Sequence, residues 1–142
     1  MTQITLDAAR AIIAGALTMA REMALKPLTI VVLDAGGHIV ALEREDGSSS
    51  LRPAIACGKA GGALSLGISS RKIAEMAEQR PAFVGSLSGI APHGIVPAAG
   101  GVIVVDPDGR PLAAVGVTGD TSDNDEICAL AGIAAAGLRH RD

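Results

Sequence analysis

The chain has 142 residues, a net charge of −3 and 49% hydrophobic residues, with one Phe and neither Trp nor Tyr. This length fits a single domain over residues 1–142. The lack of a basic stripe and of aromatic stacking residues argues against nucleic-acid binding. The apolar surplus, rich in Ala and Gly, predicts a homo-oligomer.

The chain begins without a basic stretch followed by an apolar one, so residues 1–5 do not resemble a secretory signal. We therefore expect a cytoplasmic protein. Thr5 suits the N-cap of a first helix of about five turns that runs toward Lys26.

Two segments repeat one pattern, in which an apolar run, an Asp, a glycine turn and a second apolar run follow each other. The first predicts strands at Thr29–Asp34 and His38–Glu43, and the second predicts strands near Val102–Val105 and Leu112–Thr118. Short glycine turns join antiparallel neighbours, so an antiparallel sheet with helices beside it is expected.

Helices fill the interval between the two hairpins. Pro53 suits the first turn of a second helix, Ala54 to about Leu66, and Ser69 or Ser70 caps a third helix that Pro81 ends. Residues 83–99, rich in Gly, Ser and Pro, predict an irregular segment with one short helix and a fifth strand around Gly94–Val96.

Residues 81–105 carry no charge, but their prolines and glycines exclude a membrane span. After the second hairpin, Ser122 or Asp123 caps a last helix over Asp125–Ala136. Cys57 and Cys128 lack metal-ligand spacing, and neither a disulfide nor a zinc site is indicated.

Lys59 is the only charged residue between Arg52 and Arg71. An ammonium on an apolar helix either reaches water or faces a carboxylate, a ligand or a neighbouring subunit. Arg44 and Asp46, at the end of the second strand, fall on one face by strand alternation. They suit either a carboxylate-bearing ligand or a solvated rim.

Three histidines are present. His38 follows the Gly36–Gly37 turn and His93 lies in the irregular segment, and either could ligate a metal or haem iron through a neutral imidazole. A lone histidine in a turn is more often polar surface. His140 lies in a charged tail that we expect to be disordered. No nucleophile elbow, Walker loop or paired-histidine motif identifies a reaction.

Several of these motifs, taken in order, resemble the GlcG/HbpS-like haem-binding family, which also occurs as the C-terminal domain of PduO-type corrinoid adenosyltransferases. The resemblance covers nearly the whole chain and rests on residues 31–38, Leu42, Arg44, 46–47, Ala56, 59–60, 100–101, 114–119, 125–126, 128–129 and 131–132. It implies a profilin/PAS-like α/β (α+β) domain in the order α-β-β-α-α-(β)-β-β-α. A curved antiparallel sheet of about five strands is then flanked by helices.

The sequence departs from haem-binding members of that family. A first-helix histidine is among their proposed iron ligands, and this helix has none, whereas the turn histidine His38 is retained. Gly61–Gly62 replaces more usual Thr or Ala, and the missing Tyr and Trp remove common porphyrin contacts. The chain therefore looks closer to the GlcG-type branch.

Our leading hypothesis is a small-molecule-binding accessory of a catabolic pathway, with haem or another planar or anionic ligand. The pocket would be lined by the first hairpin, the second helix and Gly100–Gly101. His38 would coordinate iron or hydrogen-bond the ligand, while Lys59 and Arg44, beside Asp46, would pair carboxylates such as propionates. Alternatively, Lys59 and Arg44 serve a cofactor-independent tautomerase, isomerase or hydrolase, or the chain is a structural subunit.

Overall fold

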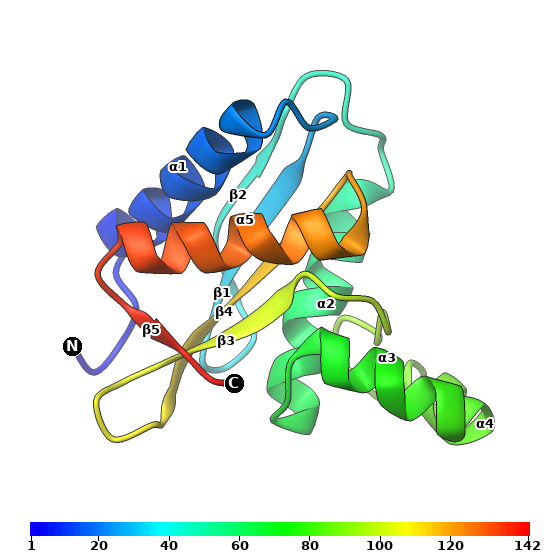
Figure 1. The fold of residues 1–142 in the computed structure, drawn as a ribbon. Helices are drawn as coiled ribbons and strands as arrows, with labels where there is room; N and C mark the ends of the chain where they lie inside the picture. Colours follow the sequence, from blue (N-terminus) through cyan, green and yellow to red (C-terminus); the bar gives the residue numbers. More distant parts are fainter.

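A computed structural model describes residues 1–142 as five helices and one five-stranded antiparallel sheet (Figure 1). The predicted α+β class is confirmed. The elements in chain order are α1 (Leu6–Glu22), β1 (Thr29–Asp34), β2 (Ile39–Arg44), α2 (Arg52–Leu66), α3 (Ser70–Gln79), α4 (Pro81–Leu87), β3 (Gly101–Val105), β4 (Pro111–Thr118), α5 (Ser122–Ala135) and β5 (Arg139–His140).

The two hairpins join along their inner strands, which gives the sheet order β2-β1-β4-β3-β5. In the central pair, Val31 of β1 lies opposite Gly116 of β4. The β1–β2 register shifts between Val32 and Leu33, where a bulge begins. Strand β2 therefore forms one edge of the sheet and the short β5 forms the other.

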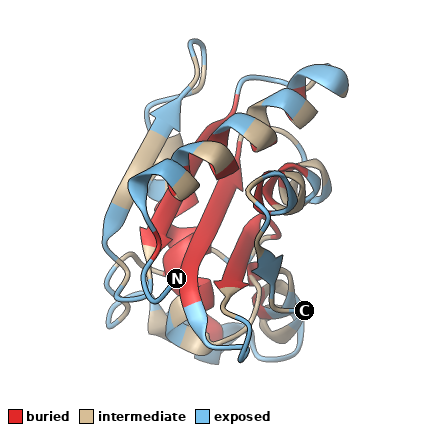
Figure 2. Cartoon of the chain, turned by 90° about the vertical axis from the view of Figure 1, so that its left-hand side faces the viewer, coloured by how far each residue is buried: buried red, intermediate tan, exposed pale blue.

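Helices cover both faces of the sheet, and strand alternation divides the core between them (Figure 1). Ile30 and Val32 of β1 pack in the cluster that includes α1 and α5. Val31 and Leu33 point the other way and pack in the cluster that includes α2. Figure 2 shows the resulting buried central strands, with exposure increasing toward the outside.

Glycines allow α2 to approach the sheet closely. A Cβ atom added at Gly116 would lie 2.1 Å from the Ala56 carbonyl oxygen, and one added at Gly101 would lie 2.2 Å from the Lys59 carbonyl oxygen. The backbone of α2 therefore rests directly on β3 and β4, and this contact sets the position of Lys59.

Side-chain caps fix most helix starts. Thr5 Oγ1 accepts a hydrogen bond from the Ala8 amide, as predicted, and Ser69 Oγ accepts one from the Lys72 amide. The cap of α5 is Thr121, whose hydroxyl accepts from the Asn124 amide, so the prediction of Ser122 or Asp123 was wrong by one or two residues.

The fifth strand is not at residues 94–96. There, the Val96 amide donates to the Gly58 carbonyl, because the segment lies on the glycine face of α2 and not beside a strand. The fifth strand is β5 in the C-terminal tail, where His140 pairs with Val104, so the expectation of a disordered tail is also corrected. Arg141 holds this tail through its Nη2 atom, 2.8 Å from the Gly109 carbonyl oxygen.

Pro81 follows the third helix, as predicted, and is also the first residue of the short helix α4. The short helix allowed for within residues 83–99 thus begins earlier than expected. None of the helices combines the length and the hydropathy needed to cross a membrane.

Candidate functional site

Lys59 lies on α2 and is buried in the protein interior. Its side chain is 3% exposed, and its Nζ atom donates to the Val117 carbonyl oxygen at 3.0 Å and to Asp125 Oδ2 at 3.2 Å. The Asp125 side chain is 1% exposed, and its other oxygen accepts from the Asp120 amide. Of the partners that the sequence left open for this ammonium, the structure supplies a carboxylate.

The pair connects α2, on one face of the sheet, with the first turn of α5, on the other. Burial lowers the pKa of the Lys59 ammonium and raises the pKa of the Asp125 carboxyl, and the attraction between the two charges opposes both changes. The arrangement is a desolvated cross-layer link. The sequence placed Asp125 only at the start of the last helix, and it did not identify this residue as the partner of Lys59.

Gly100 and Gly101 border Lys59. A Cβ at Gly100, where φ is +127°, would lie 3.0 Å from Lys59 Nζ and 2.4 Å from the Val117 carbonyl oxygen. The lack of side chains at this point therefore provides the space that the lysine occupies. Lys59 and Gly100–Gly101 do come together, as the hypothesis requires, but they enclose the ammonium in the protein interior.

His38 lies elsewhere, on the turn between β1 and β2, with a side chain that is 81% exposed. Its Nδ1 atom is 3.3 Å from Asp34 Oδ1, which also accepts from the amides of Gly36 and His38. The hydrogen bond from the His38 amide is the main cause of a lowered pKa at Asp34. No hydrogen bond involves Nε2 of this ring.

A hollow of about 240 Å³ lies beside His38, between the turn and the N-terminal segment. Its walls are Thr2, Gln3, Ile4, Asp34, Ala35, Gly36, His38, Val40 and Leu112. Ile4 and Leu112 are buried and Val40 is partly buried, so these side chains expose little surface to the hollow. The lining of the hollow is more polar than apolar, and the imidazole of His38 is one of its polar groups.

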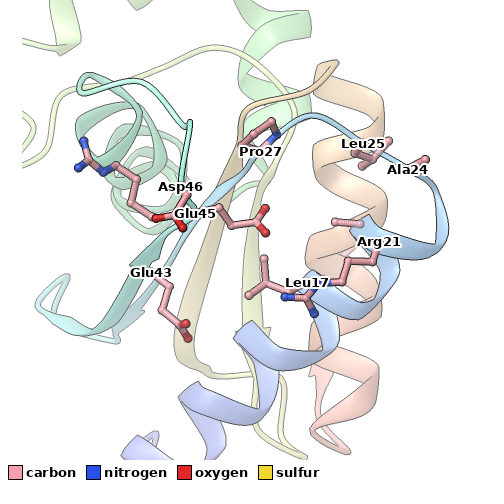
Figure 3. Close-up of a pocket in the computed structure, with 10 residues that line it drawn as sticks. Leu17, Arg21, Ala24, Leu25, Pro27, Glu43, Glu45 and Asp46 are labelled. Atoms are coloured by element: carbon pink, nitrogen blue, oxygen red, sulfur yellow. The ribbon is translucent and has the colours of Figure 1, made fainter.

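Arg44 and Asp46 border a different and larger recess of about 460 Å³, between α1 and the end of β2. The side chains of Arg21 and Glu45 point into it from opposite walls (Figure 3). Neither Arg44 nor Asp46 belongs to an ion pair, while Glu45 Oε1 accepts from the Leu28 amide at 2.8 Å. The recess is open and mixed in charge.

The structure therefore distributes the predicted site residues over three places: the interior at Lys59, the hollow at His38 and the recess at Arg44. His93 lies in none of these. Its Nε2 atom is 2.6 Å from the Gly37 carbonyl oxygen, and its ring lies over Gly61, where an added Cβ would approach it to 2.9 Å. Gly61, a glycine inside a helix, was the sequence signal for this contact. Through it, His93 connects the β1–β2 turn to α2.

No group of three or more His, Cys, Asp or Glu side chains is arranged to hold a metal ion. A metal held mainly by a macrocycle needs only one or two protein ligands. His38 has a carboxylate beside Nδ1 and borders a hollow of about 240 Å³. His140 also lies 3.3 Å from a carboxylate, that of Asp142, but through Nε2, and it borders a smaller hollow of about 150 Å³.

A family model described as "Haem degrading protein HbpS-like" matches residues 4–134. Among solved structures, a double mutant of HbpS from Streptomyces reticuli is 30% identical with a TM-score of 0.81, covering 94% of this chain and 87% of that one. The Klebsiella pneumoniae protein ORFY is 25% identical with a TM-score of 0.85, covering 96% and 93%.

The PduOC domain, solved as a complex with heme, is 18% identical with a TM-score of 0.86 and covers 99% of each chain. At 18% identity, this similarity shows a shared fold only. No curated protein matches this sequence.

Proposed function

Because the chain belongs to the HbpS-like family, we propose that it binds haem, or another planar anionic small molecule, in the hollow beside His38. Two relatives support the proposal in different ways. HbpS is 30% identical to this chain over the aligned residues, and the PduOC domain, which was solved as a complex with heme, shares the fold.

The observation that carries the proposal is the pairing of His38 with Asp34. Histidine ligands of metals commonly donate their second ring nitrogen to a carboxylate, which fixes the tautomer and orients the ring. Here Nδ1 lies 3.3 Å from Asp34 Oδ1, so we expect the ring proton on Nδ1 and the lone pair of Nε2 free for an iron ion. Haem would supply the iron, and His38 would hold it through Nε2.

The size and charge of the hollow define how haem would fit. Its volume of about 240 Å³ is below the usual range for a drug-sized ligand, roughly 300–1,000 Å³. The hollow could therefore enclose only part of a porphyrin. Lys59 is enclosed and Arg44 borders another recess. We therefore expect propionates to extend into solvent and binding to be moderate.

Titration of the purified protein with haemin tests this site. The wild type should give a stoichiometric Soret shift, and His38→Ala should weaken binding at least about tenfold, since the ligand atom is lost. Asp34→Asn should weaken it less, by removing only the orienting contact. His140→Ala, another exposed histidine, serves as the matched control and should bind as the wild type does. Equal binding by His38→Ala would contradict the assignment.

We also propose that the protein acts in the cytoplasm as an accessory of a catabolic pathway, which its resemblance to GlcG-type proteins supports. An enzymatic role for Lys59 is not proposed, because its ammonium is enclosed and already bonded to Val117 and Asp125. Deletion of the gene should impair growth on one carbon source and leave growth on glucose unchanged.

A further inference from the structure

The two edges of the sheet differ in how they are protected. At one edge, β5 has only two residues, and short edge strands resist pairing with other chains. The other edge, β2, has six residues, Ile39–Arg44, with neither Pro nor Lys. Figure 2 shows that the central strands are buried, while every residue of β2 is half-buried or exposed. Strand β2 is therefore the edge where a further strand can pair.

The hydrogen bonds identify which amides of β2 face outward. The Glu45 amide donates to the Leu28 carbonyl, so alternation along the register directs Glu43 and Ala41 toward β1 and leaves Leu42 and Arg44 facing outward. A second observation agrees. The Val117 amide donates to the Gly100 carbonyl, so Gly116 faces β1 and its partner Val31 faces β4, away from Leu42.

We propose that a second copy of this chain pairs with β2 in the antiparallel direction, about a two-fold axis at Leu42. Such an interface is isologous, because the same strand contributes both halves. Leu42 would exchange both backbone hydrogen bonds with Leu42 of the second copy. The proposal assigns a surface to the self-association that the apolar composition predicts, and it does not depend on haem binding.

Charge selects both the direction and the register. The acidic residues Glu43, Glu45 and Asp46 lie at one end of the strand. Parallel pairing would bring these acidic ends together. With an antiparallel axis at Leu42, the two Glu45 residues are six positions apart, about 20 Å at 3.4 Å per residue.

The neighbouring axis positions are worse. An axis at Glu43 would place the two Glu43 residues directly opposite each other, and an axis at Arg44 would place Glu43 opposite Glu45 of the second copy. Like charges in these positions are destabilising. On the other side, an axis at Ala41 would pair Leu42 directly with Val40, where the bulge interrupts the regular ladder. Leu42 is thus the axis position that avoids both problems. Its half-buried side chain joins the cluster on the α2 face, where the two leucines would meet.

Disulfide trapping tests the axis. In the proposed dimer the two Leu42 Cα atoms are about 5.5 Å apart, as in any hydrogen-bonded pair, and this distance suits a disulfide. Mild oxidation of Leu42→Cys should therefore give a covalent dimer on a non-reducing gel. Ile39→Cys is the matched control. Its side chain is 54% exposed, but the two copies would lie about 20 Å apart. The native cysteines are buried.

Absence of the Leu42→Cys dimer, or equal trapping of Ile39→Cys, would overturn the proposal. Amide exchange in the wild type provides a test that needs no variant. The outward amides of Leu42 and Arg44 should be protected to a degree similar to the inward amide of Glu43. Fast exchange at Leu42, or a monomeric mass by light scattering at the same concentration, would show that the edge is free.

Discussion

Replacing Lys59 with Met keeps most of the side-chain volume but removes the charge, and we expect a large loss of stability. The substitution leaves the Asp125 carboxylate, 1% exposed, without its counter-ion and the Val117 carbonyl without its donor. Breaking one side of a buried ion pair costs about 3–5 kcal/mol. With a urea slope of about 2 kcal/mol per molar, the unfolding midpoint should fall by roughly 2 M.

Urea unfolding followed by circular dichroism measures this loss. The matched control is the double variant Lys59→Met with Asp125→Asn. It should recover most of the stability, because no buried charge then remains unpaired. A midpoint for Lys59→Met within about 0.5 M of the wild type, which corresponds to about 1 kcal/mol at this slope, would refute the view that the pair is desolvated.

The deficit of Lys59→Met should also depend on pH. Burial raises the pKa of Asp125 above 3.8, and in this variant no ammonium opposes the effect. The folded state then binds the proton more tightly than the unfolded state does, so stability falls as pH rises through the folded pKa. Unfolding at pH 4 should therefore show a smaller deficit than unfolding at pH 7.

Two further predictions concern packing and capping. Gly116→Ala should cost about 1–3 kcal/mol or more in thermal or urea unfolding, because its Cβ would lie 2.1 Å from the Ala56 carbonyl oxygen; Gly85→Ala, in α4 with nothing within 4 Å, should cost nothing. A side-chain hydrogen bond from Asn124 and backbone bonds from Lys26 and Thr121 lower the pKa of Asp120 to about 2. Its contribution is therefore present above pH 3.8 and lost as pH falls through about 2, so Asp120→Ala should be less stable than the wild type at pH 5, and the difference should shrink as the pH falls toward and below 2.

Local patterns predicted most of the elements. The strand Thr29–Asp34 has the predicted bounds. As predicted, Thr5 caps α1 and Ser69 caps α3. These features depend on neighbours a few residues apart, such as a glycine turn or a hydroxyl before a helix. The pairing of β1 with β4, which joins the hairpins, depends on contacts about 80 residues apart, and nothing in either hairpin specifies it.

In the candidate site, too, local features could be predicted from the sequence and long-range contacts could not. Lys59 was recognisable because an isolated cation among small aliphatic residues needs a partner. That partner is Asp125, 66 residues later, and only the sheet brings the two together. The placement of His38 on an exposed turn followed from its sequence position. Its distance from the lysine did not, because helix α2 presents Lys59 to the far layer and not to the turn.

The two-residue strand β5 limits how the sheet can grow. A chain with two open edges of matching length can add copies at both and extend as a fibre. Here β5 pairs with one edge, and Arg141 holds it to the β3–β4 turn. In the proposed dimer, pairing at β2 would use up the other edge in both molecules. Association would then stop at two copies and would not extend into a filament.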